Sequence, residues 1–164
     1  MPPDETTIRP ITAADKSLLQ AGLSQLSRES AERRFLAAKP RFTDAELRYL
    51  TEVDGHDHIA LVVLEDGGAL VAVGRMVRTG EDIAELAVIV CDDWQRRGIG
   101  TELARTLAAA MAAKGVTRIS GTMLATNRAA LRLMRALGPI ESGALSGGVR
   151  EVVVRVGAPV VLAA

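Results

Sequence analysis

Residues 83–100 read IAELAVIVCDDWQRRGIG, and this stretch decides the fold that the chain can adopt. Its first half is an aliphatic run that predicts a β-strand over Ile83–Cys91 and contains one carboxylate, Glu85. Its second half brings two glycines to the start of an alanine-rich segment with helical periodicity. The stretch therefore predicts a strand, a tight turn and the start of a helix.

The turn also predicts an anion site. Backbone N–H groups in the first turn of a helix have no partners within the helix, and the helix dipole favours a negative charge there. We expect the N–H groups of residues 96–101 to hold the pyrophosphate of a nucleotide-bearing cofactor, with the glycines permitting close approach and an arginine adding charge. The predicted cofactor site at this turn consists of Gln95, Arg96, Arg97, Gly98, Ile99, Gly100 and Thr101.

The composition limits which classes of protein this chain can belong to. The chain has 164 residues, of which 48% are hydrophobic, so we expect a single domain over residues 1–164. Lys plus Arg and Asp plus Glu both number 20, so bulk charge favours neither nucleic acid nor a membrane surface as a partner. The single cysteine fits a reducing compartment. The first residues lack the basic and apolar regions of a signal peptide, and together these features predict a cytoplasmic protein.

The rest of the chain predicts a mixed α/β fold. Apolar runs separated by turn residues predict antiparallel hairpins, whereas the strand, helix and strand between Ile83 and Gly121 predict a parallel pair. We expect a mainly antiparallel sheet of about six or seven strands with a parallel central pair, flanked by helices. The predicted strands are 7–11, 58–64, 69–77, 83–91, 116–121 and 149–156; the predicted helices are 12–26, 30–38, 43–50, 99–114 and 127–137; a glycine-rich loop is predicted over 143–148 and a short apolar tail, flexible or ending a strand, over 157–164.

Capping residues mark three of the predicted helix starts. Thr12 followed by Asp15 resembles an N-cap arrangement, and Thr43 followed by Glu46 forms a capping box. We expect Ser30 to cap the second helix.

Two separate motifs resemble one family. The turn QRRGIG (Gln95–Gly100), placed after a strand and before a helix, resembles motif A of the GCN5-related N-acetyltransferases. The segment NRAALRLMRALG (Asn127–Gly138) resembles the Asn-x-x-Ala-x-x-Leu-Tyr-x-x-Leu-Gly helix of the same family. The resemblance covers nearly the whole chain. It implies an acyltransferase fold whose sheet splays between the fourth and fifth strands, with acetyl-CoA (coenzyme A) as the cofactor.

A narrower resemblance lies upstream. The segments SRESAERRF (Ser27–Phe35), Lys39–Arg41 and Val53–Val62 are similar to the acetyltransferase domain of Pat-type bacterial protein lysine acetyltransferases. In those proteins the domain is often fused to an acyl-CoA-synthetase-like or cyclic-nucleotide-binding region, and neither is part of these 164 residues. The resemblance implies a protein lysine as the acceptor, and a separately encoded regulatory chain remains open.

Acyl transfer to an amine needs a base, because a lysine amine with a pKa of about 10.4 is mostly protonated at pH 7. Glu85 is the candidate general base, since Ile83, Ala87 and Ile89 share its strand face and would raise its pKa by desolvation. The catalytic glutamate of Pat-like domains resembles Glu85 in position. The alternative is a structural carboxylate paired with a cation such as Arg75.

Further site residues follow from the same chemistry. Backbone N–H groups of Val88, Ile89 and Val90 would polarise the thioester oxygen where the sheet splays. Asn127 would contact the pantetheine arm or the departing sulfur, or would simply follow a Thr126 helix cap. Met134 stands where many family members carry a tyrosine proposed as general acid, so the sulfur would leave as thiolate or take a proton from water or another group.

Two clusters and the single cysteine have alternative roles. His56 and His58 lie near Asp54 and Asp57, but their spacing on a turn does not supply a ligand set, and we predict no metal site. Cys91 is a small core residue or, less simply, a covalent acyl carrier. A basic cluster either docks an acidic protein surface, lines the cofactor entrance or forms a solvated helix face, and it consists of Arg28, Arg33, Arg34, Lys39 and Arg41.

The sequence thus predicts an acetyl-CoA-dependent N-acetyltransferase that acts on a protein lysine. One alternative keeps the chemistry but takes a small amine as the acceptor. Another is a non-catalytic acyl-CoA-binding module that regulates a partner, which the methionine at position 134 favours.

Overall fold

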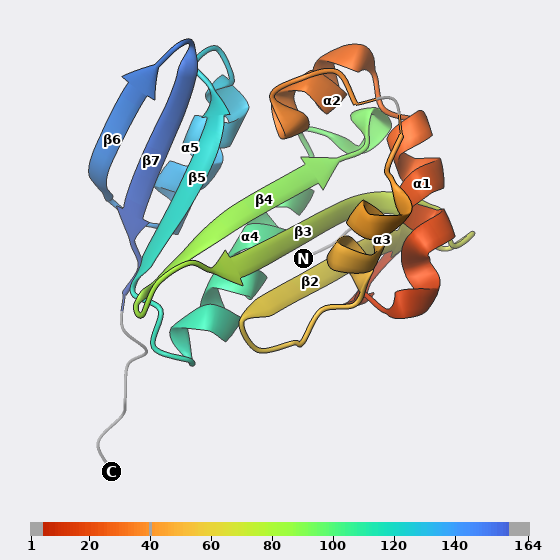
Figure 1. Cartoon of the computed structure of the whole chain (residues 1–164), viewed down its shortest axis with the longest axis horizontal. Helices are drawn as coiled ribbons and strands as arrows, with labels where there is room; N and C mark the ends of the chain where they lie inside the picture. Colours follow the sequence, from red (N-terminus) through yellow and green to blue (C-terminus); the bar gives the residue numbers. More distant parts are fainter. Residues whose placement is uncertain (1–4, 40, 158–164) are drawn as a thin grey trace.

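The computed structural model describes residues 5–39 and 41–157. Within these ranges the chain forms one seven-stranded sheet in the order β1-β2-β3-β4-β5-β7-β6, as Figure 1 shows. All neighbours are antiparallel except β4 and β5, which are parallel, so the predicted fold class is confirmed. The strands are β1 Thr6–Pro10, β2 His58–Glu65, β3 Leu70–Arg78, β4 Ile83–Val90, β5 Arg118–Leu124, β6 Ile140–Ser146 and β7 Val149–Arg155.

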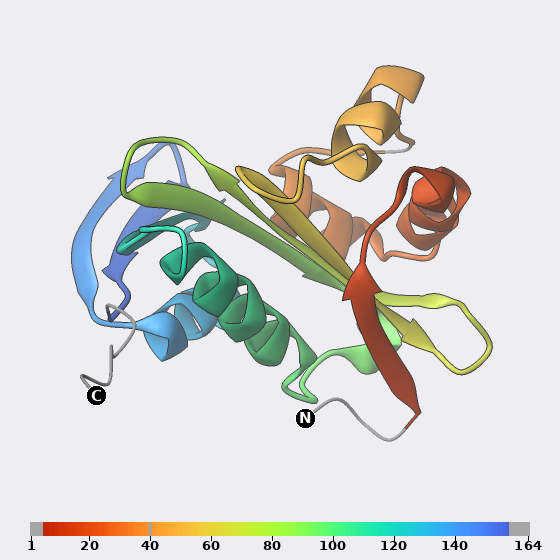
Figure 2. The ribbon, with the colours of Figure 1, turned by 90° about the horizontal axis from the view of Figure 1, so that it is seen from below.

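Helices cover both faces of the sheet. One face carries α1, α2 and α3, and the other carries α4 and α5, as the view in Figure 2 makes plain. Each face has its own apolar core, one around Leu19 and Val62 and the other around Leu103 and Met111. The helices are α1 Lys16–Ser24, α2 Arg28–Phe35, α3 Asp44–Thr51, α4 Ile99–Ala112 and α5 Arg128–Leu137, with 3₁₀ turns at Ala13–Asp15 and Asp92–Trp94.

The parallel pair separates soon after it forms. β4 pairs with β5 only from Ile83 to Glu85, opposite Arg118 to Ser120. Beyond Glu85 the two strands diverge, and Figure 1 shows the opening that widens toward α2. The remainder of β4, up to Val90, keeps its pairing with β3. One edge of β4 is therefore left without a neighbouring strand where the functional site forms.

The start of α3 follows its predicted cap, and the start of α2 does not. The capping box of Thr43 and Glu46 begins α3 as predicted. The prediction that Ser30 caps α2 is wrong, because the Ser27 side chain accepts the N–H of Ser30 and α2 begins at Arg28. A serine three residues further along is a good cap in sequence alone, but here Ser30 is buried in the first turn and its hydroxyl is used elsewhere.

The predicted loop over 143–148 is mostly strand. β6 runs to Ser146 and pairs with β7, so the connection shrinks to Gly147 and Gly148, which have φ angles of 58° and 76°. Two consecutive glycines with positive φ form the tight hairpin turn that matches strand twist. All residues of β6 are exposed, so the strand carries no hydrophobic alternation that sequence reading could detect.

Two further expectations concern the membrane and the C-terminus. Across residues 5–39 and 41–157, every helix is too short or too polar to cross a membrane. The predicted tail falls outside the described residues from 158 onward.

Candidate active site

The turn before α4 leaves donors free. Gly98 is the N-cap of α4 with φ 80° and ψ 2°, and no side chain caps the helix. The first bond within the helix runs from the Glu102 N–H to the Gly98 carbonyl, at 3.0 Å. The N–H groups of Ile99, Gly100 and Thr101 therefore have no partner within the helix and can hold an anion.

A hydrogen-bond network holds this turn against α2. The Gln95 amide donates to the Val90 carbonyl at 3.0 Å and to the Ser30 hydroxyl at 3.1 Å. Ser30 in turn donates to one Asp92 carboxylate oxygen at 3.2 Å, and the Ser27 N–H donates to the other at 3.2 Å. Gln95, predicted as a cofactor contact, thus braces the turn from the inside.

The two arginines of the turn diverge. Arg97 donates to the Asp93 carbonyl at 3.0 Å, and its guanidinium carbon lies 4.8 Å from the centre of the Trp94 ring. It does not line the groove described below, whereas the exposed Arg96 does. Arg96 also has a left-handed backbone, with φ 63°. Of the two predicted phosphate-binding arginines, the geometry therefore favours Arg96.

The free edge of β4 presents alternate backbone groups. The Cys91 N–H donates to the Val71 carbonyl, and the Ile83 carbonyl accepts from the Thr79 N–H. The backbone N–H and C=O groups of the odd-numbered residues of β4 therefore point toward β3. Because the strand alternates without a bulge, the N–H groups of Val88 and Val90 point into the opening, and that of Ile89 points toward β3. The expectation of a thioester contact from the Ile89 N–H therefore does not fit the strand's geometry.

Glu85 stands at the point where β4 leaves β5. Its side chain is exposed, so the expected burial among strand neighbours is wrong. No side-chain hydrogen bond or ion pair joins Glu85 to another residue in the described ranges, and Arg75 donates instead to the Leu50 carbonyl at 3.0 Å. The cation that faces Glu85 is Arg34: burial lowers the pKa of the Arg34 guanidinium, and the Glu85 carboxylate acts to raise it.

Asn127 combines two predicted roles. It is itself the N-cap of α5, so the expected Thr126 cap is wrong. Its side-chain oxygen accepts the Ala130 N–H at 3.1 Å, which leaves its NH₂ group free to donate into the groove. Met134, in the next turns of α5, is 2% exposed and packs against Gly121, so this position supplies an apolar wall and no proton.

The histidine and cysteine candidates have structural explanations. One Asp54 oxygen accepts the N–H groups of His56 and His58, at 2.8 and 2.9 Å, which shapes the turn. Among the described residues no three His, Cys, Asp or Glu side chains converge on a metal site. Burial raises the pKa of the Cys91 thiol, and Asp92 raises it further, so the thiolate that a covalent route needs is disfavoured.

The basic cluster divides between ion pairs and the groove. Arg33 pairs with Glu29 at 2.7 Å and Lys39 with Glu46 at 2.6 Å, which are surface pairs of small energetic value. Arg33 and Arg34 also line the groove, so part of the cluster lies at the expected cofactor entrance.

A groove of about 780 Å³ joins these parts. It runs from α2 across the opening between β4 and β5 to the start of α5, and its volume suits a cofactor-sized ligand. All predicted site residues except Arg97 line it. Sequence reasoning missed Arg128 and Arg132, whose spacing of four residues in the helix after Asn127 signals a shared face. Its lining includes five arginines against the single carboxylate of Glu85, a balance that favours an anionic ligand: Arg33, Arg34, Arg96, Arg128 and Arg132.

Comparisons with known proteins agree with this geometry. The sequence pattern of the acetyltransferase (GNAT) family matches residues 23–138. Acetyltransferase Pat from Mycolicibacterium smegmatis is 36% identical over 136 residues, which cover 81% of this chain and 40% of that protein's length. The GNAT domain of S. lividans PAT superimposes with a TM-score of 0.84 at 28% identity, covering 92% of this chain and 90% of that one.

A second structure was determined with its cofactor. It is a phosphinothricin acetyltransferase from Sinorhizobium meliloti in complex with acetyl-CoA, with a TM-score of 0.73 at 19% identity over 93% of this chain and 89% of that one. At that identity the likeness concerns the fold alone. The family pattern spans the strand, the glycine turn and α5, which are the elements that build the groove. The chain therefore belongs to the GNAT acetyltransferase family.

Proposed function

We propose that this chain is an acetyl-CoA-dependent N-acetyltransferase that modifies a lysine ε-amine of a protein substrate, with Glu85 as the general base. The observation that carries the proposal is the position of Glu85. Its carboxylate is exposed to the groove, without an ion-pair partner among the described residues, where β4 separates from β5. Three residues further along, the Val88 N–H points into the same opening.

Different residues of the chain would bind different parts of the cofactor. The free N–H groups at the start of α4, with Arg96 beside them, would hold the pyrophosphate, and the Asn127 NH₂ group would contact the pantetheine arm. The Val88 N–H would donate to the carbonyl oxygen, because of the two N–H groups that point into the opening it lies nearer to Glu85 along β4. Bound acetyl-CoA supplies the activated acetyl group as a thioester.

Glu85 supplies the base. A carboxylate that is exposed and unpaired is free to accept a proton from the incoming ammonium, directly or through water. Met134 cannot donate a proton to the departing sulfur. A thiol with a pKa of about 8.5 can leave as thiolate, so the reaction does not require an acid at this position.

The acceptor is inferred from the relatives. The curated relative and the S. lividans domain are both named Pat, and the resemblance to Pat-type domains extends to the α2 segment beside the groove. A small amine as the acceptor, or a regulatory module that binds the cofactor without turnover, would leave the same cofactor site. A separately encoded regulatory chain is compatible with each.

A Glu85→Gln variant tests the assignment. The side chain is exposed, so the substitution should not affect folding, and removal of a general base should lower acetylation about 10²–10⁴-fold without weakening coenzyme A binding. Acetyl-lysine mass spectrometry of a lysate incubated with acetyl-CoA measures the activity. Glu81→Gln, an exposed carboxylate outside the groove, is the matched control.

Different outcomes separate the alternatives. Equal acetyl-lysine yields from the wild type and Glu85→Gln would contradict the proposal. Free-thiol release with small amines alone would identify the acceptor as a small molecule. At 100 times its dissociation constant, acetyl-CoA should stabilise the fold by about 2.7 kcal/mol, and such a shift without thiol release would indicate the regulatory module.

A further inference from the structure

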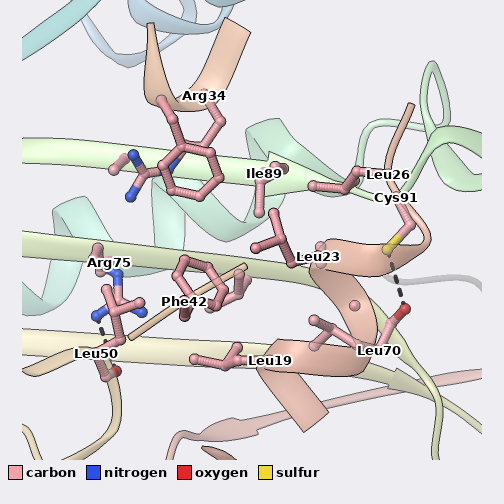
Figure 3. Close-up of a pocket in the computed structure, with 15 residues that line it drawn as sticks. Leu19, Leu23, Leu26, Arg34, Phe42, Leu50, Leu70, Arg75, Ile89 and Cys91 are labelled. Atoms are coloured by element: carbon pink, nitrogen blue, oxygen red, sulfur yellow. Dashed lines mark hydrogen bonds between the residues drawn. The ribbon is translucent and has the colours of Figure 1, made fainter. Parts of the chain in front are cut away.

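A second, smaller pocket adjoins the groove. It has a volume of about 40 Å³ and lies between the helices α1–α3 and the sheet (Figure 3). Its walls are mostly apolar and include Leu23 and Phe42. Arg34, Phe35, Ala87 and Ile89 line both the pocket and the groove, so the two cavities meet at these residues.

Arg75 is a buried cation at this pocket. It is 5% exposed, and one of its terminal nitrogens contacts the Leu50 carbonyl at 3.0 Å and His58 Nε2 at 2.9 Å. Its other two guanidinium nitrogens have no hydrogen-bond partner among the described residues, and no carboxylate there forms an ion pair with it. Figure 3 shows its guanidinium on the same side of the pocket as that of Arg34.

The charges around the two arginines do not balance. Burial and the charge of Arg34 together lower the pKa of Arg75 to about 10. Tyr49 acts to raise the pKa of Arg75, but its phenol is neutral at pH 7 and supplies no compensating negative charge. Burial and the charge of Arg75 lower the pKa of His58, which keeps that ring uncharged. Among the described residues, the carboxylate that acts on Arg34 is that of Glu85. An excess positive charge remains beside an apolar cavity, which is costly without an anion.

The position of the pocket identifies which part of a ligand would reach it. Arg75 is the direct cross-strand partner of Ala87, so both side chains project from the same face of the sheet. Ala87 and Ile89 flank Val88, whose N–H we assign to the carbonyl oxygen of the acyl group. The atoms beyond that carbonyl are therefore the part of the ligand nearest to the pocket.

We propose that this pocket selects an acyl donor whose short aliphatic chain ends in a carboxylate, of the succinyl-coenzyme A class. The carboxylate would pair with Arg34 and Arg75, and the methylene groups would lie against Phe35, Ala87 and Ile89. The inference rests on the proposed function and extends the donors of the same groove from acetyl-CoA to this longer class.

The transfer is balanced with a donor of this class. The amine nitrogen forms a bond to the thioester carbonyl carbon, and the carbon–sulfur bond breaks. The ammonium nitrogen loses two protons in all, one to Glu85 before it attacks and one to solvent as the amide forms. Coenzyme A leaves as thiolate and takes up a proton from solvent, and the distal carboxylate is unchanged in the amide product. No oxidant or further reactant is required.

Isothermal titration of coenzyme A, acetyl-CoA, butyryl-CoA and succinyl-CoA tests the proposal by binding alone. Butyryl has the same number of carbons as succinyl but no charge. We expect succinyl-CoA to bind about tenfold or more tightly than butyryl-CoA, as charged hydrogen bonds allow. Arg34→Gln and Arg75→Gln should each reduce this ratio to below about threefold. Arg28→Gln, on the same helix as Arg34 but outside both cavities, is the control that should keep it.

The outcomes distinguish the two proposals. Butyryl-CoA binding as tightly as succinyl-CoA would overturn this inference and leave the proposed function intact. A failure of every thioester, acetyl-CoA included, would overturn both. If Arg75→Gln does not fold, because Arg75 holds the end of α3, the half-buried Arg34→Gln still decides the outcome.

Discussion

Two alanine substitutions in the same turn should have opposite effects on stability. Gly98 has φ 80°, a left-handed conformation that costs an alanine about 1–2 kcal/mol. A Cβ at Gly98 would meet nothing within 4 Å, so this cost is purely conformational. For a domain of this size the melting temperature of Gly98→Ala should fall by about 2–8 °C.

Gly100 differs from Gly98 in its backbone conformation and in the contacts that an added Cβ would make. It lies inside α4, where alanine is compatible with the backbone, and a Cβ there would sit 3.4 Å from Val90, 3.5 Å from Leu133 and 3.7 Å from Val88, which is ordinary contact. Gly100→Ala should therefore be as stable as the wild type or up to about 1 kcal/mol more stable. Its methyl group would nevertheless narrow the groove, because all three neighbours line it.

The assay compares urea unfolding and coenzyme A titration for the wild type and both variants. We expect both variants to bind coenzyme A more weakly, while only Gly98→Ala loses stability without ligand. The reasoning is refuted if Gly98→Ala unfolds at the same urea concentration as the wild type, or if Gly100→Ala is the less stable of the two. Unchanged coenzyme A affinity in both variants would show that the cofactor does not bind at this turn.

Two further predictions concern the other helix starts. Hydrogen bonds from Arg9, at 2.8 Å, hold the pKa of the buried Asp15 at about 2, below its ordinary 3.8. This pair should contribute about 1–2 kcal/mol above pH 4, after allowance for the exposure of Arg9, and urea unfolding should show the loss as pH falls from about 4 to 2, but not in Asp15→Asn. Asn127→Ala should cost about 1 kcal/mol through the lost α5 cap and weaken coenzyme A binding, whereas Asn127→Asp should keep the cap and weaken only binding; equal stability of the two variants would contradict the cap.

Sequence reasoning works where local rules decide the structure. Glycines that open a helix leave their donors free whatever surrounds them, so the turn before α4 follows from Gln95–Gly100 alone. Ser30 shows the limit of such rules. Either of two serines fits the cap position of α2 by type, and the choice depends on Asp92, which lies 62 residues away and takes the Ser30 hydroxyl. A contact of that range leaves no local pattern.

The site shows the same division. The residue types of the groove were predictable, but the direction in which each group points was not. The Ile89 N–H turns toward β3 because of strand register, and Arg97 folds back onto Trp94. Glu85 has aliphatic neighbours along β4, yet its side chain is exposed, because it lines the groove at the last β4–β5 pair, where the two strands begin to separate. Only the three-dimensional pairing reveals that.

The hydrogen bonds that join Gln95 and Asp92 to the start of α2 also affect the order in which the ligands bind. The N-terminal end of α2 is fastened to the turn that would hold the phosphates, and its C-terminal end brings Arg34 and Phe35 to the acyl end of the groove. A donor that orders the turn would therefore also order α2 and the residues at the acyl end of the groove. Kinetics with the donor binding first, and slower hydrogen exchange across α2 once it has bound, are the behaviour that this connection favours.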